Sequence, residues 1–318
     1  MWHYTNGPGL ISILSHHVLW ATSAPFLNDQ QEVALGGELI VRRLLELGES
    51  EGADEFFSAM AQKVRDGVDH GQGPSPAAFF ILSASQVWDS LVMWRNYGGA
   101  QESYAIGIDA DAPLRVLGDP TIDPELFGDK PGTGINVRRT RWEPVRYDEG
   151  EQLALVDAVF DGLPEEFTRF RDRLGDFDKT SPDGIPPEAY AELNEARDDL
   201  EQALLLIKHS GFVDERETRQ AIVMWTADDP AARALEARLV RYRSTAYGMA
   251  PYLELTGAPA GTPANEPVAR EAAHLPIRAV AISPSPNGDD ATDSLRGLLT
   301  SRGYRDVPVL RSSIPFRG

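Results

Sequence analysis

Strand-like patterns lie at both ends of this 318-residue chain, whereas helical patterns are grouped in its middle. WHYT at residues 2–5 is aromatic and β-branched, and the closing stretches IRAVAI and VPVL have a similar character. Residues 151–174 and 186–208 carry long, charged, periodic patterns typical of a pair of helices. Segregation of this kind favours an α+β fold with a mixed sheet core over a regularly alternating doubly wound sheet. We therefore expect a single domain over residues 1–318, with a helical insertion at about 150–210.

The N-terminal region predicts a strand, a helix, a second strand and a loop. WHYT is followed by the turn signal NGPG, by LISILSHH with apolar residues at helical spacing, and by the strand-like VLWATS. The loop APFLNDQQE comes next, and its Asn28 and Asp29 offer short polar side chains after an apolar anchor. We expect Asn28 to shape a binding site. The alternative is that both residues only form a turn or cap a helix.

The composition places the chain among folded proteins and restricts its chemistry. Hydrophobic residues make up 42% of the chain, and no run of about 18 apolar residues predicts a membrane span. The N-terminus lacks the pattern of a signal peptide, so the cytoplasm is the default expectation. The absence of cysteine excludes disulfides, thiolate metal sites and a cysteine nucleophile. The six histidines show no metal-binding spacing, and we expect no metal.

The charge of the chain argues against a broad nucleic-acid surface. The formal net charge is −19, and phosphate binding is driven by Lys and Arg. Binding of nucleic acid by a local basic groove is the alternative that the net charge leaves. Solubility or adaptation to salt is the simpler interpretation of the acidity.

The densest stretch, LSASQVWDSLVMWRNYG at residues 82–98, mixes aromatic with small polar and charged residues. Ser83 and Ser85 follow the apolar run AAFFIL, so we expect them at the end of a strand. Trp94 and Tyr97 follow at near-helical spacing. They either pack a helix against the core or form the wall of a binding site.

Several segments together resemble the bacterial domain-of-unknown-function family 2971. HYTNGPGLISILSHHVLWATSAPFLNDQQE is similar to the family's opening block, and LSASQVWDSLVMWRNYG followed by SYAIGID is similar to its second block. DERETR resembles its Glu-x-Glu-x-Arg block, and the segment from IRAVAISP to VLRSSIPFR resembles its close. The resemblance spans almost the whole chain, although NDQQE stands where members usually have Asn-Asp-Pro-Phe-Glu.

A second resemblance, to the ADP-ribosyltransferase superfamily, rests on the order of three features. One branch of that superfamily has a basic residue on its first strand, then Ser-x-Ser, then Glu-x-Glu. This chain has His3 on its first strand, Ser83 and Ser85, and Glu215 and Glu217 in the same order. The resemblance implies an ADP-ribosyltransferase-like fold and NAD as the substrate. The residues that we expect to bind the cofactor are His3, Tyr4, Thr5, Ser83, Ser85, Trp94, Tyr97 and Asn28.

The chemistry of NAD cleavage gives these residue types a physical reason. Breaking the nicotinamide–ribose bond builds positive charge on the ribose, which a carboxylate stabilises. Two carboxylates in a Glu-x-Glu on a strand share a face, because side chains alternate with period two. The resemblance assigns Glu217 to the ribose and Glu215 to the acceptor, which is a protein, a nucleic acid or water.

Other interpretations of the same residues stay open. His3 is also typical of a strand histidine without a ligand, and the two glutamates also fit ion pairs with Arg216 and Arg219 on a solvated face. The alternative function is a non-enzymatic module that senses a ligand or partner through an aromatic pocket. The chain has no phosphate-binding Gly-Lys-Ser/Thr loop and no Gly-x-Ser-x-Gly nucleophile elbow.

Overall fold

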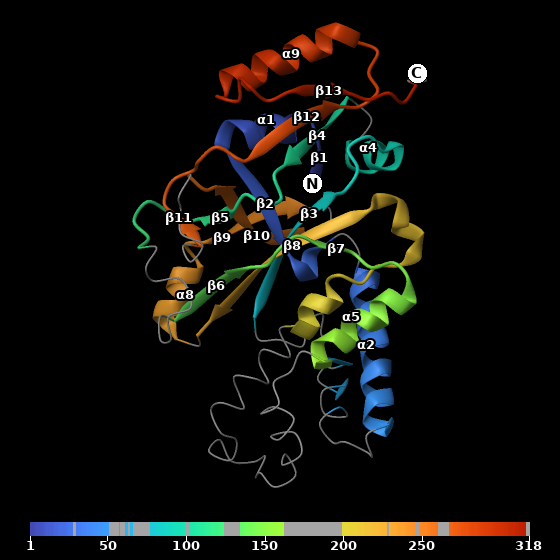
Figure 1. The fold of residues 1–318 in the computed structure, drawn as a ribbon. Coiled ribbons are helices and arrows are strands. Elements are labelled where there is room, and N and C mark those ends of the chain that lie inside the picture. The colour runs from blue at the N-terminus through green and yellow to red at the C-terminus, as the bar shows by residue number, and fades with distance from the viewer. Residues whose placement is uncertain are drawn as a thin grey trace. The chain divides into compact units, whose positions relative to one another are not determined.

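The chain folds into two compact units, and it passes from one to the other several times (Figure 1). Unit 1 comprises Met1–Ser23, Phe79–Pro144 and Val213–Gly318, and unit 2 comprises Ala24–Ala78 and Val145–Phe212. Unit 2 is therefore built from two insertions into the chain of unit 1. The computed structural model describes residues 1–27, 30–50, 57, 61–62, 64–65, 77–98, 102–123, 134–161, 199–227, 229–245, 248–259 and 267–315.

Unit 1 is organised around a mixed sheet, as the predicted α+β class requires. In the described residues the sheet has thirteen strands, and its main path runs β11-β5-β10-β2-β3-β1-β4-β12-β13. Outside this path, β8 pairs with β3, and β6 and β7 both pair with β8. Strand β9 pairs with β10. The strands are β1 (Trp2–Asn6), β2 (Val18–Ser23), β3 (Ala78–Ser85), β4 (Ser103–Ile108), β5 (Leu114–Leu117), β6 (Ile135–Arg139), β7 (Glu143–Pro144), β8 (Glu217–Thr226), β9 (Val240–Thr245), β10 (Gly248–Gly257), β11 (Val268–Ala269), β12 (Ile277–Ile282) and β13 (Val309–Arg311).

The predicted opening of strand, helix and strand is confirmed by β1, α1 (Gly7–His16) and β2. Asn6 caps the helix, because its side chain accepts a hydrogen bond of 2.8 Å from the backbone N–H of Gly9. Pro8 occupies the first turn, where its missing N–H has no partner to lose. His17 ends the helix in a left-handed conformation with φ of 56°, which turns the chain directly into β2.

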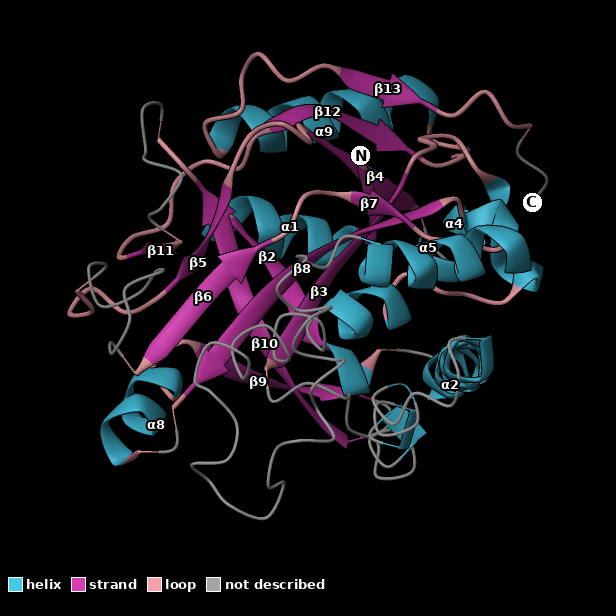
Figure 2. Cartoon of the chain, turned by 60° about the horizontal axis from the view of Figure 1, so that its bottom comes forward, coloured by secondary structure: helices cyan, strands magenta, loops and turns pink. Residues whose placement is uncertain are grey.

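Strand β3 connects the parts of the sheet that carry the predicted site. It pairs antiparallel with β2 through Thr22 and Ile81, and with β1 through Trp2 and Ser85. It also pairs with β8, which continues to β6, and Figure 2 shows β6, β8 and β3 as neighbouring strands. Strand β1 and strand β8, which begins two residues after Glu215, therefore both pair with β3.

The helices of unit 1 pack around this sheet. Helix α4 (Leu91–Gly98) packs on β1 and β4, and α8 (Pro230–Glu236) packs near β6 and β8. The C-terminal α9 (Gly288–Ser301) connects the parallel strands β12 and β13, as Figure 1 shows in red. Asp289 and Asp290 lie in the first turn of α9, where acidic side chains stabilise a helix.

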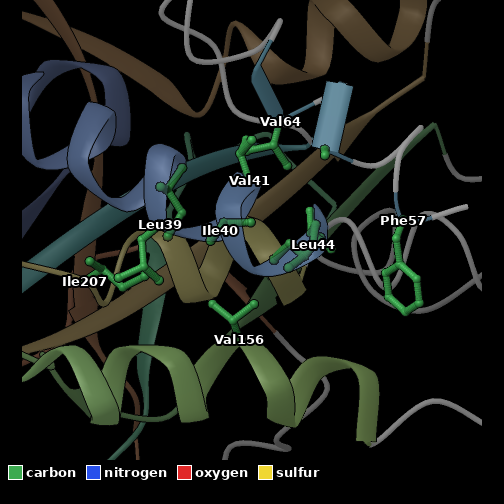
Figure 3. Packing of buried hydrophobic residues seen from close by; sticks show 11 residues of the cluster. Leu39, Ile40, Val41, Leu44, Phe57, Val64, Val156 and Ile207 are labelled. Carbon is green, nitrogen blue, oxygen red and sulfur yellow. The ribbon is translucent and has the colours of Figure 1, made fainter. Parts of the chain in front are cut away.

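Unit 2 is helical in its described part. It contains the short η1 (Ala24–Phe26), α2 (Gln30–Ser50) and α5 (Glu149–Asp161). Figure 3 shows Val156 of α5 pointing toward Ile40 and Leu44 of α2, and all three side chains are fully buried in one hydrophobic cluster. The predicted helical insertion at about 150–210 falls in this unit, but its residues 162–198 lie outside the described part of the chain.

An ion pair joins the same two helices of unit 2. Arg43 of α2 contacts Asp157 of α5 through both carboxylate oxygens, at 2.6 and 2.9 Å. The planar guanidinium fits a carboxylate in this two-bond geometry, which fixes the register between the helices.

Candidate functional site

Tyr4 and Trp94 belong to the core of unit 1. Tyr4 is 7% exposed and Trp94 is 4% exposed, and their rings meet edge to face with centroids 4.7 Å apart. The Tyr4 hydroxyl donates a hydrogen bond of 2.9 Å to the carbonyl of Val87. Burial raises the pKa of Tyr4, which keeps this hydroxyl protonated. Of the two interpretations of the aromatic stretch at residues 82–98, packing therefore describes Trp94.

Asp89 anchors α4 to the C-terminal segment. Its Oδ1 accepts hydrogen bonds from Trp94 Nε1 at 3.0 Å and from the hydroxyl of Ser312 at 2.6 Å. Its Oδ2 accepts from the backbone N–H and the hydroxyl of Ser313, at 3.0 and 3.2 Å. Burial alone would raise the pKa of Asp89, but these donors outweigh it and hold the pKa below its ordinary value. Sequence reasoning missed Asp89, because its partners lie far along the chain.

His3 projects from the face of β1 opposite to Tyr4, since side chains alternate along a strand. Its Nδ1 lies 3.1 Å from the carbonyl oxygen of Ser83. A carbonyl only accepts, so Nδ1 carries the hydrogen and Nε2 of the neutral ring is an acceptor. Burial lowers the pKa of His3 more than this hydrogen bond raises it. His3 is therefore a neutral group at pH 7, unlike the charged residue that the resemblance suggests for the first strand. Thr5 lies on the same face of β1.

Ser83 and Ser85 lie at the end of β3, as predicted from the sequence. Ser85 is fully buried, and its hydroxyl donates a hydrogen bond of 2.8 Å to the backbone carbonyl of Glu215. The same hydroxyl accepts one of 3.1 Å from the N–H of Val87. Ser85 therefore joins the end of β3 to the segment that carries the two glutamates.

Glu215 and Glu217 do not lie on one strand, which corrects the prediction that they share a strand face. Glu215 ends the 3-10 helix η4 (Ser210–Glu215), whereas Glu217 begins β8. Arg216 between them has a left-handed φ of 43°, which breaks the two-residue alternation. The carbonyl of Arg216 accepts a hydrogen bond of 2.9 Å from the N–H of Gln86, so this turn is tied to the residue after β3.

Glu217 forms a buried ion pair with Arg219. The guanidinium donates two hydrogen bonds, from Nε to Oε1 at 2.8 Å and from Nη2 to Oε2 at 2.9 Å. The two residues are 7% and 5% exposed. The sequence suggested this pairing as an alternative, since residues two apart share a strand face, but it suggested a solvated face instead of a buried one.

Glu215 faces Tyr97 of α4. The hydroxyl oxygen of Tyr97 lies 3.4 Å from each carboxylate oxygen of Glu215. This is longer than a usual O–H···O hydrogen bond of about 2.5–3.0 Å. Tyr97 is 38% exposed, whereas Glu215 is 5% exposed. The pair thus places the hydroxyl of a partly exposed tyrosine beside a buried carboxylate.

The structure brings some of the predicted residues of unit 1 together, whereas Tyr4 and Trp94 pack in the core and Glu217 pairs with Arg219. Ser85 and Tyr97 converge on Glu215, one at its backbone and one at its side chain. His3 joins β1 to β3 at Ser83, next to this group. Asn28, the remaining predicted residue, lies outside the described residues. Within the described ranges, no three His, Cys, Asp or Glu side chains are grouped so that they could hold a metal ion.

Comparisons with protein-family models, with curated proteins and with solved structures found no match to this chain. In the part of the chain that the structure describes, no helix is both long and apolar enough to cross a membrane. Function therefore has to be inferred from the side chains of the site itself.

Proposed function

We propose that unit 1 binds NAD and cleaves its nicotinamide–ribose bond, as an ADP-ribosyltransferase-like protein that also resembles the bacterial domain-of-unknown-function family 2971. The observation that carries the proposal is the convergence of Ser85 and Tyr97 on Glu215. Ser85 fixes the backbone of Glu215, and the hydroxyl of the partly exposed Tyr97 lies 3.4 Å from its carboxylate oxygens. A preorganised carboxylate next to a hydroxyl donor is suited to hold a ribose and to stabilise positive charge on it.

Glu215, and not Glu217, is the carboxylate that we assign to the ribose. The charge of Glu217 is already balanced by Arg219 through two hydrogen bonds. The Glu215 carboxylate instead faces Tyr97, whose hydroxyl oxygen lies 3.4 Å from each of its oxygens, and Ser85 fixes its backbone. Glu217 and Arg219 then act as positioning residues that hold the start of β8. This assignment gives Glu215 the role at the ribose that the sequence resemblance suggested for Glu217.

The reaction itself needs few groups from the protein. The C1′–N bond breaks, and its electron pair leaves with nicotinamide, which departs neutral. Positive charge on the ribose is stabilised by Glu215 until water or an acceptor hydroxyl forms the new bond at C1′. The proton of that nucleophile passes to Glu215 or to solvent.

The second candidate function is a module that binds its ligand without turnover. Burial favours this alternative, because Glu215 and Glu217 are only 5% and 7% exposed. Tyr4 and Trp94 are also committed to core packing and leave little ring surface for nicotinamide.

Two measurements on the full-length wild-type protein separate these functions. Calorimetry with NAD tests binding, and nicotinamide release from NAD tests cleavage. The proposal expects both to be positive. Binding of NAD without release of nicotinamide would favour the module, and absence of NAD binding would contradict both the enzyme and the choice of ligand.

A further inference from the structure

One face of the strands β2, β10 and β9 gathers two aromatic and two basic side chains. Tyr252 of β10 lies opposite Thr22 of β2 on one side and opposite Arg241 of β9 on the other. Directly opposed residues of antiparallel strands point to the same face, and alternation adds Trp20 and Arg243 to it. All these residues belong to unit 1, and Figure 2 shows β9 and β10 as adjacent strands.

Arg243 is held in place on this face by two contacts. Its guanidinium carbon lies 5.6 Å from the centroid of the Trp20 ring, and its Nη2 donates a hydrogen bond of 3.0 Å to the hydroxyl of Thr22. Trp20 in turn packs on Tyr252, with ring centroids 4.7 Å apart. An arginine stacked on an aromatic ring keeps its planar N–H edge available and loses little freedom when it binds an oxyanion.

Among the described residues, the two arginines of this face outnumber its one carboxylate, Glu254. Within the described chain, no carboxylate lies within ion-pair distance of Arg241 or Arg243, and the buried Nε of Arg243 has no hydrogen-bond acceptor. Glu254 also projects from this face, opposite Trp20, but pairs with neither arginine. Neither arginine forms an ion pair with a described carboxylate, although the chain has a net charge of −19.

Trp20 is the accessible part of the same group. It is 40% exposed, although it sits in the middle of β2 between the fully buried Leu19 and Ala21. Tyr252 beneath it is 8% exposed. The face therefore presents an aromatic edge next to two cationic donors, and this combination is suited to a ligand that joins a phosphate to an organic group.

We propose that Arg243 and Arg241, organised by Trp20, form a binding site for the phosphate group of a small phosphate ester. The phosphate oxygens accept hydrogen bonds from N–H groups of Arg243 and Arg241. Trp20 contacts the organic part of the ligand. The site involves none of the residues that carry the proposed NAD cleavage, and it stands without that function.

The test is calorimetric titration of the full-length protein at low salt with three probes, namely AMP, ribose 5-phosphate and inorganic phosphate. We expect at least one of them to bind, and we expect adenosine, which lacks the phosphate, to bind at least tenfold more weakly than AMP if AMP is the ligand. The probe that binds best shows whether a base, a sugar or the phosphate alone is recognised. Raising the salt concentration should weaken binding, because the contact is ionic. No binding of any probe by the wild-type protein overturns the proposal.

Variants then assign the binding to this face. Arg243→Gln should weaken the best probe by about tenfold or more, because one charge-assisted contact of this kind is lost. Arg241→Gln, at a residue without the Trp20 contact, serves if Arg243→Gln unfolds, and should also weaken binding severalfold. Arg296→Gln on the exposed surface of α9 is the matched control and should bind as the wild type does. Unchanged affinity in both face variants overturns the proposal. Nicotinamide release is a separate readout, so either proposal can fail alone.

Discussion

At the scale of single residues, the ion pair between Glu217 and Arg219 is the feature most sensitive to change. Both side chains are buried, and their two hydrogen bonds satisfy each other's charge. Removing one partner from a buried pair leaves a desolvated charge, whereas removing both does not.

Arg219→Ala should therefore destabilise the protein by about 3–5 kcal/mol, because it leaves the Glu217 carboxylate buried without the guanidinium. Chemical denaturation followed by tryptophan fluorescence measures this change. The double replacement of Glu217→Leu with Arg219→Met should recover most of the loss. Arg296→Ala, which breaks an exposed pair with Asp293, should cost less than about 1 kcal/mol. A variant at Arg219 that is as stable as the wild type would show that the pair is solvated.

A second residue-scale feature is the cluster of His17, His274 and Tyr304 in unit 1. The two imidazole rings lie 4.4 Å apart, and Nδ1 of His17 lies 2.9 Å from the Tyr304 hydroxyl. Burial lowers the pKa of His17, and the charges of His274, His16 and Arg302 lower it further. Protonation of His17 is thus harder in the folded chain than in the unfolded chain.

The sign of the pH dependence follows from that lowered pKa. The unfolded chain binds the proton first, so the contribution of His17 to stability is complete above its ordinary pKa of 6.5 and is lost as the pH falls below it. We expect the melting temperature to fall from pH 7.5 to pH 5.5. His17→Asn keeps a residue type that accepts the left-handed backbone and removes the imidazole, so its melting temperature should change less over this range. Equal slopes for the two proteins would exclude His17 as the source.

At the scale of elements, Asp89 couples α4 to the segment after β13. Asp89→Ala removes an acceptor of four hydrogen bonds and should cost about 1.5–3 kcal/mol, the range for a hydrogen bond to a charged group. Amide hydrogen exchange of Ser313 should accelerate, because its N–H donates to Asp89. Asp293→Ala on the surface of α9 is the control and should leave that amide unchanged. Protection of Ser313 that persists in the Asp89 variant would mean that the C-terminal segment is held by packing alone.

Some of these elements could be predicted from the sequence, and others could not. The order β1, α1 and β2 was predictable because Asn6, Pro8 and the apolar spacing of α1 are local signals. The strand end at Ser85 was predictable from the change from apolar to small polar residues. The positions of Glu215 and Glu217 were not, because the left-handed φ of Arg216 is imposed by contacts such as the one with Gln86. The burial of Trp94 depends on β1, about 90 residues earlier, which no local pattern contains.

In the whole molecule, unit 2 is built from two separate segments of the chain, Ala24–Ala78 and Val145–Phe212. The sequence predicted a helical insertion only for the second segment, because the first follows β2 as an ordinary amphipathic helix would. The candidate site is confined to unit 1, where β1, β3, α4 and the start of β8 come from three separate stretches of chain. The site therefore forms only when the three chain segments of unit 1, which the two segments of unit 2 separate in sequence, pack together.

Nicotinamide release from NAD by Glu215→Gln shows whether Glu215 stabilises the ribose when NAD is cleaved. The substitution keeps the shape of the side chain and removes its charge, so we expect a loss of rate on the order of 10² to 10³ with NAD still bound. Glu271→Gln, at an exposed residue of unit 1, should release nicotinamide at the wild-type rate. Thermal melting of each variant shows that it is folded. A folded Glu215→Gln variant that releases nicotinamide as fast as the wild type would contradict the account.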